Sequence, residues 1–256
     1  MTFKAIDSKI YGANLRSEPS FGNNIVGYVN QCEAVEVIGP KQGDRWMPCK
    51  VDGHPDNVFI SENVLRNLVS EPRERLAREC VKQWLRFDKE TGKEHENPYY
   101  RYIGEYWRSV YLDHLDGTDR NFPWAGPFVS FCVQAAGGYD GFRYAAAASK
   151  YVHQAIRSRL DNENGPFWGF KVTEHKPQIG DMVCSRRGSE KINYEEAAQS
   201  NAFGSHCDIV ISVRDDHVST IGGNIKNTVS RVNFHTNSEG YLQEANRLIC
   251  VMRNNL

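Results

Sequence analysis

The chain of 256 residues lacks long apolar runs, and neither sign of charge dominates it. Lys and Arg total 31 against 32 Asp and Glu, a formal net charge of −1 that gives no case for wholesale binding to nucleic acid or an anionic membrane. We therefore expect no nucleic-acid partner and no membrane insertion. The opening MTFKAIDSKIYG lacks the apolar stretch of a secretory signal, which predicts synthesis in the cytoplasm and any later delivery by a signal-independent route.

Metal-binding and disulfide patterns are missing as well. The seven cysteines stand without CxxC spacing, and the eight histidines form neither HxH nor HExxH pairs. An odd, dispersed set of cysteines argues against a disulfide framework and a structural zinc site, so we expect neither a metal nor another cofactor. Most of the cysteines are predicted to be small buried hydrophobic residues.

Short apolar segments separated by Gly, Asp and Pro breaks fill the first part of the chain. They occupy residues 13–20, 25–29, 34–38, 45–51 and 58–61. Such spacing predicts a small antiparallel β-barrel over residues 1–68.

Residues 69–256 change from helical to strand patterns. Helices are predicted from Ser70, Tyr99, Ala125 and Ala145, and strands at 182–184, 207–213, 218–222, 229–234 and 248–252. Arg214-Asp215-Asp216 is typical of a hairpin turn. Helices followed by an antiparallel sheet indicate an α+β domain, the order also found in papain-like folds.

The stretch Asn121–Gly138, NFPWAGPFVSFCVQAAGG, predicts a turn and then a helix over 125–136 that ends at Gly137-Gly138. The start of a helix presents unpaired N–H groups and partial positive charge. Both features suit a thiolate nucleophile and the oxyanion that forms when it attacks.

Two family resemblances follow from short motifs. LRSEPS, VGYV, W-x-x-C-K-V and VFISENVL occur in the order of a bacterial Src-homology-3-like domain, which implies binding of cell-wall peptide; a packing module is the alternative. The stretch WAGPFVSF resembles the nucleophile helix of the NlpC-type superfamily of papain-like cell-wall amidases and peptidases. The pattern of that helix is roughly Asp-Cys-Ser-Gly-Phe-Val-Ser.

Further motifs of the second domain appear in the order of that superfamily. They are FWGF at 167–170, PQIGDMVC at 177–184, SHCDIVI at 205–211 and IGGN at 221–224. Together they resemble an uncharacterised branch that includes effectors of type VI secretion. The resemblance implies that His206 is the catalytic base.

The group that orients His206 has two candidates. Asn224 follows the next strand and offers a carbonyl that can hold the productive imidazole tautomer. Asp208 lies two residues beyond His206 and so on the same strand face, where a buried carboxylate needs a partner. The sequence favours Asn224 over Asp208.

Alignment of the helix pattern places the family nucleophile, usually Cys or Ser, at Ala125. Three explanations stay open: a substitution that inactivates a toxic enzyme, a natural pseudoenzyme, or a nucleophile elsewhere. Cys132 and Ser130 are candidates for the third, although Cys132 lies two turns, ~10 Å, deeper along the helix.

The resemblance implies a peptidoglycan amidase or endopeptidase that works by Cys-His(-Asn) chemistry. It further implies an antibacterial effector that acts in the target-cell periplasm, with a secretion-system component and a cognate immunity protein as partners. A non-catalytic wall-binding protein is the alternative, and Ala125 supports it. A thiol enzyme that uses Cys132 or Cys207 is the third hypothesis.

Overall fold

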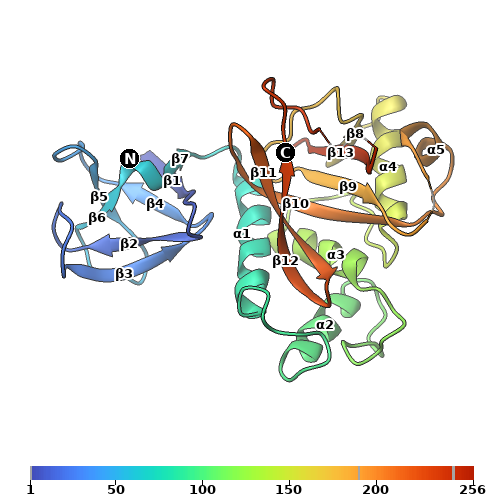
Figure 1. The fold of residues 1–256 in the computed structure, drawn as a ribbon, viewed down its shortest axis with the longest axis horizontal. Helices are drawn as coiled ribbons and strands as arrows, with labels where there is room; N and C mark the ends of the chain where they lie inside the picture. The colour runs from blue at the N-terminus through green and yellow to red at the C-terminus, as the bar shows by residue number, and fades with distance from the viewer. Residues whose placement is uncertain (1, 190, 244–245) are drawn as a thin grey trace. The chain divides into compact units, whose positions relative to one another are not determined.

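The computed structural model describes residues 2–189, 191–243 and 246–256. It is an α+β protein with two antiparallel sheets, which confirms the predicted fold class (Figure 1). The chain divides into two compact units, Met1–Glu74 and Arg75–Leu256, whereas the sequence prediction drew the boundary after residue 68. Over the described ranges, no helix combines the length and apolar character that crossing a membrane requires.

The first unit is built on a seven-stranded sheet in the order β3-β2-β6-β5-β4-β1-β7. Its edge strands β3 and β7 do not pair with each other among the described residues, so the sheet is open and the predicted small barrel does not close. Its core contains Ile6, Leu15, Val29 and Ile60, all fully buried. The strands are β1 (Thr2–Ile6), β2 (Gly12–Arg16), β3 (Ile25–Asn30), β4 (Ala34–Val37), β5 (Trp46–Lys50), β6 (Val58–Ser61) and β7 (Leu65–Asn67), with a 3-10 turn, η1 (Glu62–Val64).

The second unit contains a six-stranded sheet in the order β12-β11-β10-β9-β13-β8. The predicted hairpin between β10 and β11 is present, since the Arg214 N–H donates to the His217 carbonyl at 2.8 Å. The sequence missed β8. The strands are β8 (Phe167–Phe170), β9 (Met182–Arg186), β10 (Ser205–Val213), β11 (His217–Ile225), β12 (Thr228–His235) and β13 (Leu248–Asn254).

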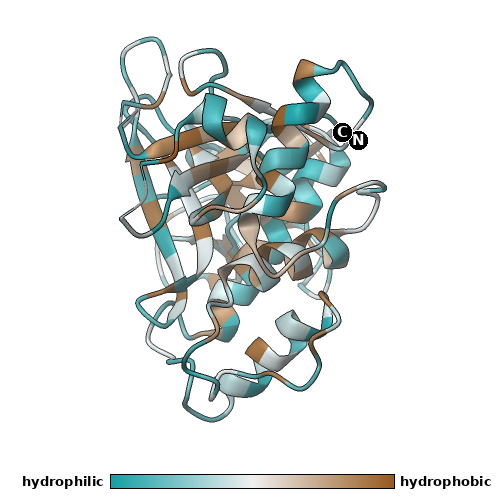
Figure 2. Ribbon diagram, turned by 90° about the vertical axis from the view of Figure 1, so that its right-hand side faces the viewer, coloured by the Kyte–Doolittle hydropathy of each residue, from teal (hydrophilic) through white to brown (hydrophobic). Residues whose placement is uncertain are grey.

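Helices pack against this sheet through apolar faces. α3 contacts β10 and β11, whereas α4 contacts β8, β10 and β13. Apolar segments concentrate on these strands and helices, and the peripheral loops are largely hydrophilic (Figure 2). Burial of these apolar faces stabilises the unit by about 25 cal/mol for each Å² removed from water. The helices are α1 (Glu71–Arg86), α2 (Tyr99–Arg108), α3 (Ala125–Ala136), α4 (Ala148–Leu160) and α5 (Tyr194–Gln199).

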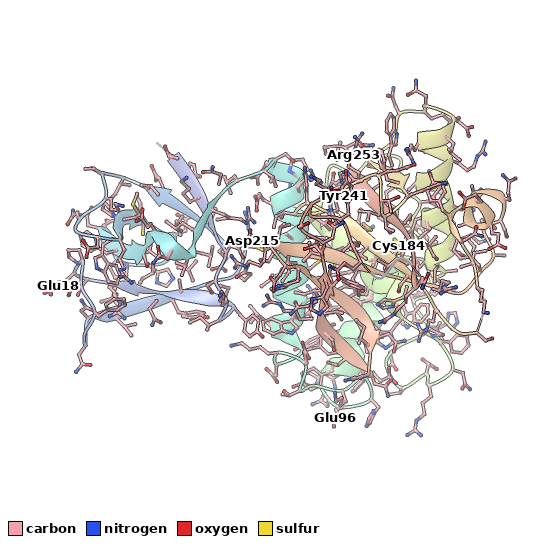
Figure 3. All side chains as sticks on the ribbon, turned by 45° about the horizontal axis from the view of Figure 1, so that its top comes forward. Glu18, Glu96, Cys184, Asp215, Tyr241 and Arg253 are labelled. Atoms are coloured by element: carbon pink, nitrogen blue, oxygen red, sulfur yellow. The ribbon has the colours of Figure 1, made fainter. Side chains whose placement is uncertain are left out.

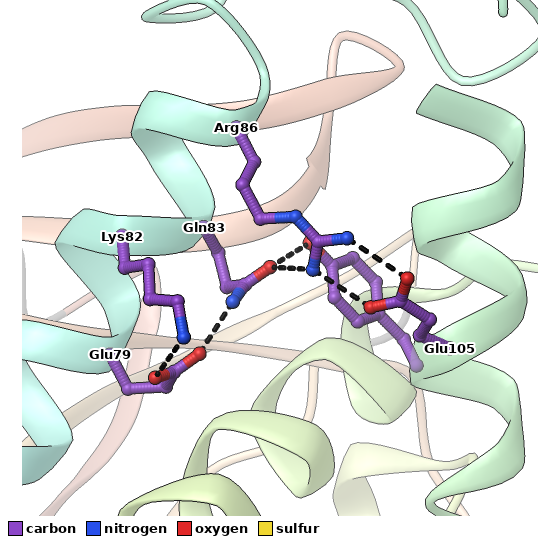
Figure 4. Close-up of polar contacts among 6 residues, drawn as sticks. Glu79, Lys82, Gln83, Arg86 and Glu105 are labelled. Carbon is purple, nitrogen blue, oxygen red and sulfur yellow. Dashed lines mark hydrogen bonds and ion pairs between the residues drawn. The ribbon is translucent and has the colours of Figure 1, made fainter. Parts of the chain in front are cut away.

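A polar network joins α1 to α2 (Figure 4). The Arg86 guanidinium donates two parallel hydrogen bonds to Glu105, at 2.8 and 2.9 Å. The carbonyl of the buried Gln83 accepts from the Tyr106 hydroxyl at 2.9 Å and from Arg86 at 3.0 Å. Bidentate pairs fix orientation as well as distance. The network therefore sets the position of α2 on α1, just before Trp107 in the last turn of α2.

Asp181, in the PQIGDMVC motif that leads into β9, has a structural role. Its fully buried carboxylate accepts the Gln178 N–H at 2.8 Å and the Asn254 N–H at 2.9 Å, and lies 2.8 Å from His175 Nε2. It therefore ties the start of β9 to the end of β13. Cys184, in β9, lies inside the unit, whereas Glu96 lies at its periphery (Figure 3).

Candidate functional site

The first turn of α3 carries the predicted nucleophile position. Ala125 is the first residue of the helix, as predicted, and is 3% exposed. The Phe128 N–H bonds to the Trp124 carbonyl at 3.0 Å, and Pro127 has no N–H. Ala125 and Gly126 therefore supply the N–H groups of this turn that lack an acceptor within the helix. Two such donors, with the helix dipole behind them, can stabilise an oxyanion.

Trp124, which precedes the helix, is held by Glu94. Its indole Nε1–H donates to Glu94 Oε2 at 2.8 Å, and the ring is 2% exposed. The Glu94 N–H in turn donates to the Asn227 carbonyl at 2.9 Å, in the turn between β11 and β12. Glu94 thus links the start of α3 to the sheet. The sequence analysis missed this residue, which lies in a charged loop without a motif.

His206 and Asp208 form a close pair at the start of β10. His206 Nε2 lies 2.9 Å from Asp208 Oδ1, and their side chains are 13% and 3% exposed. A carboxylate oxygen accepts a hydrogen bond, so this contact suits the imidazole tautomer that carries its proton on Nε2 and leaves Nδ1 as the acceptor nitrogen. His206 and Asp208 therefore lie on one face of β10, as expected. Their geometry is that of a base and the acid that orients it.

Gly222 and Gly223, near the end of β11, bring this pair close to α3. A Cβ on Gly222 would lie 1.7 Å from Asp208 Oδ1 and 3.0 Å from His206 Nε2. A Cβ on Gly223 would lie 2.5 Å from Phe128 Cβ and 2.8 Å from the Trp124 ring. Both approaches require glycine. Adjacent residues of one strand thus contact the His–Asp pair and the first turns of α3.

Asn224, the orienter that the sequence favours, forms no hydrogen bond with His206 in the part of the chain that the structure describes. No hydrogen bond of the Asn224 side chain occurs among the described residues, and its backbone has φ of 58°. Lys226 and Asn227, at φ of 54° and 63°, form the two-residue turn that follows. Asn tolerates the left-handed region of backbone conformation, so the positive φ alone accounts for an asparagine at position 224. Asp208, the alternative orienter, occupies the position next to His206.

The alternative nucleophiles lack the environment of a reactive group. Cys132 and Cys207 are 0% and 1% exposed, and burial raises the pKa of both thiols. A raised pKa leaves the inactive thiol form at neutral pH. The Ser130 hydroxyl is buried and bonds the Ala145 backbone, donating to its carbonyl at 3.2 Å and accepting from its N–H at 3.1 Å.

A cavity of about 420 Å³ adjoins the start of α3. Its lining includes Ala125 and Gly126 from α3, Ala146–Ala148 before and at the start of α4, Trp107 from α2, and Ser205, the neighbour of His206. The predicted nucleophile position and the strand that carries His206 therefore border one cavity. Within the described ranges, no cluster of three or more His, Cys, Asp or Glu side chains could hold a metal ion.

A helix N-terminus beside a buried His–Asp pair and a cavity defines a site suited to acyl transfer. Residues 94–255 match the family DUF2272, described as an uncharacterized protein conserved in bacteria, and the chain belongs to this family. No curated protein matches the chain.

Among solved structures, the chain is similar to NlpC2 from Trichomonas vaginalis, with 11% identity over 99% of this chain and 72% of that chain. The TM-score is 0.28, a likeness too low to support an inference.

Substitution of Gly222 tests the geometry of the pair. We expect Gly222→Ala to displace Asp208 and to lower the free energy of unfolding by about 1–3 kcal/mol, because the added methyl group has no space. The downfield NMR signal of the hydrogen-bonded His206 Nε2 proton should disappear. Gly165→Ala is the control, since its Cβ would meet Ser158 Oγ at an ordinary 3.4 Å. An unchanged His206 signal in Gly222→Ala would contradict the arrangement.

Proposed function

We propose that the second unit is a papain-like cysteine amidase or peptidase framework whose nucleophile position is occupied by Ala125. The observation that carries this proposal is the His206–Asp208 pair at 2.9 Å, linked through Gly222-Gly223 to the first turns of α3. A buried acid that holds an imidazole in one tautomer is the arrangement that a thiol nucleophile requires.

With cysteine at position 125, the chemistry follows from these groups. The thiolate, paired with protonated His206, attacks the amide carbonyl carbon, and the Ala125-position and Gly126 N–H groups stabilise the oxyanion. Collapse breaks the C–N bond while His206 gives its proton to the leaving amine. His206 then takes a proton from water, whose oxygen attacks the thioester carbon, and the thiolate is released. Asp208 keeps the imidazole oriented throughout.

The substrate that we propose is an amide bond in the stem peptide or cross-link of peptidoglycan. The motif resemblance of both units supports this choice, because the first unit resembles wall-binding Src-homology-3-like domains. That unit also presents Phe21, 68% exposed, with its ring 5.0 Å from Trp46 and with Arg16 and Arg45 over its face. An exposed aromatic ring with cations nearby suits contact with a peptide.

The alternative is a non-catalytic wall-binding protein. Ala125 favours it directly, because alanine has no nucleophilic atom. The preserved His206–Asp208 geometry favours the amidase framework, since binding alone has no use for an oriented imidazole. Both hypotheses assign substrate binding to the same cavity, and they differ in what restoring a thiol would do.

The Ala125→Cys variant separates the two hypotheses. We expect peptidoglycan digested with this variant to yield new stem-peptide fragments, whereas the chain with Ala125 yields none. Mass spectrometry of the fragments identifies the bond that is cut. Ala125→Cys combined with His206→Ala is the matched control and should be inactive. Products from neither Ala125 nor Ala125→Cys would support the wall-binding alternative, and products from both would place the nucleophile elsewhere.

The orienting residue can be identified in the Ala125→Cys background. We expect Asp208→Asn to lower kcat on the order of a hundredfold or more, because a neutral amide no longer selects the imidazole tautomer. Asn224→Ala should change kcat by no more than about threefold, since the side chain of Asn224 has no hydrogen bond among the described residues. Steady-state kinetics on a purified fragment checks both. The reverse ranking would restore Asn224 as the orienter.

We also propose an antibacterial role, with delivery to the target-cell periplasm by a secretion machine and an immunity protein in the producing cell. The motif resemblance to type VI effectors supports this role. An immunity protein should bind over the cavity and block Ala125→Cys activity. Co-purification with the product of the neighbouring gene is the measurement, with the cavity substitution Ala147→Trp expected to weaken the complex. Recovery of no complex would contradict this partner.

A further inference from the structure

The cavity beside α3 has a definite polarity. Its lining is mostly apolar, and none of the described residues that border it is Asp or Glu. Its ionisable side chains are His114 and Arg187. An Arg side chain donates hydrogen bonds and accepts none. A ligand that pairs with Arg187 must therefore bring acceptors.

Two residues of the lining hold buried polar atoms without partners. Trp107 is 2% exposed, and neither its Nε1 nor the Ser205 hydroxyl has a hydrogen-bond partner. Trp124 gives the contrast, since its Nε1 donates to Glu94 at 2.8 Å. Buried polar groups are nearly always satisfied, and an unsatisfied one is unfavourable. Both atoms are covered, however, so the lining offers a ligand its apolar surface and the charge of Arg187.

Arg187 adds a positive charge at the same cavity. It is exposed and forms no ion pair with the residues that the structure describes. Its backbone is fixed, because the Arg187 N–H donates to the Gly204 carbonyl at 3.0 Å. Charge complementarity at such a wall favours a carboxylate and disfavours an ammonium group.

Small residues make up part of the cavity lining, beside larger apolar ones such as Leu112, Phe122 and Phe203. Ala146, Ala147 and Ala148 line it, together with Ala125 and Gly126. Gly126 packs so closely that a Cβ there would lie 2.1 Å from the Ala146 carbonyl oxygen. Methyl groups and backbone make an apolar surface that suits small aliphatic side chains.

We infer that this cavity binds the carboxylate-bearing end of a peptide with small aliphatic side chains, namely a stem-peptide segment that ends in alanine. The inference rests on the proposed function, which supplies peptidoglycan as the source of the peptide. A segment that ends in a free amine is disfavoured by Arg187 and by the absence of acidic residues among the described lining.

Binding can be measured with the chain as it stands, because Ala125 leaves the peptide uncut. Isothermal titration compares a synthetic stem peptide that ends in alanine as the free acid with the same peptide as its C-terminal amide. We expect the acid to bind about tenfold or more tightly, the size of a charge-assisted hydrogen bond. Arg187→Met should reduce the affinity for the acid to that for the amide and leave the amide unchanged.

Two further variants sharpen the test. Ala147→Trp should weaken the acid and the amide alike, because its ring would fill part of the cavity that both ligands occupy. Arg143→Met is the matched control for charge, since Arg143 is exposed, does not line the cavity and forms no ion pair among the described residues. It should leave both affinities unchanged. Thermal unfolding of each variant verifies that the fold is retained.

Equal affinity for acid and amide, or no binding of either, would overturn the inference. An equal loss for both ligands in Arg187→Met would overturn it too. The digestion with Ala125→Cys reports separately on the proposed function. If the variant cleaves peptidoglycan but the cavity shows no preference for the acid, only the ligand assigned to the cavity is wrong. If the cavity prefers the acid but the variant does not cleave, only the proposed hydrolase function is wrong.

Discussion

The site depends on the absence of side chains at Gly222 and Gly223. One glycine lies against the His206–Asp208 pair and the next lies against Trp124 and Phe128, both at distances that exclude a methyl group. Because they are consecutive in β11, the strand sets the position of the imidazole relative to the start of α3. Rigid packing of this kind places reacting groups more reliably than a mobile loop does. The constraint is steric, so it holds whether or not position 125 carries a nucleophile.

The members of the site differ in how easily the fold can lose them. Asp208 is buried and relies on His206 as its partner, so removing His206 leaves a buried carboxyl group unsatisfied. Position 125 carries no such constraint, because alanine is a good helix residue and fits an apolar wall. Under the proposed function, a single substitution there would abolish the nucleophile without disturbing the pair. The combination of Ala125 with an intact pair is therefore what a stable, inactivated framework would contain.

Local sequence signals predicted the helix over 125–136 and the hairpin at 214–216, because a Gly-Gly stop and a charged turn act within a few residues. The choice between Asp208 and Asn224 required tertiary information. Asn224 followed the glycines as the resemblance suggested, but its left-handed backbone and the tight turn at Lys226-Asn227 account for it locally. The cavity could not be predicted, since its wall joins Trp107, Ala146 and Ser205, which no sequence period connects. Strand patterns predicted a small antiparallel barrel, but whether it closes depends on whether β3 meets β7, which such patterns do not report.

Trp107 and Trp124 differ in how the protein treats their indole N–H groups. The Trp124 N–H donates to Glu94, which in turn bonds to the β11–β12 turn, so this tryptophan is fixed by the protein itself. The Trp107 N–H is covered and has no partner, although the Arg86–Glu105 and Gln83–Tyr106 contacts hold its helix in place. A wall carried by a fixed helix needs little further ordering when a ligand binds. Ala125 and Trp107 line the same cavity, so a substitution at position 125 leaves the rest of that wall in place.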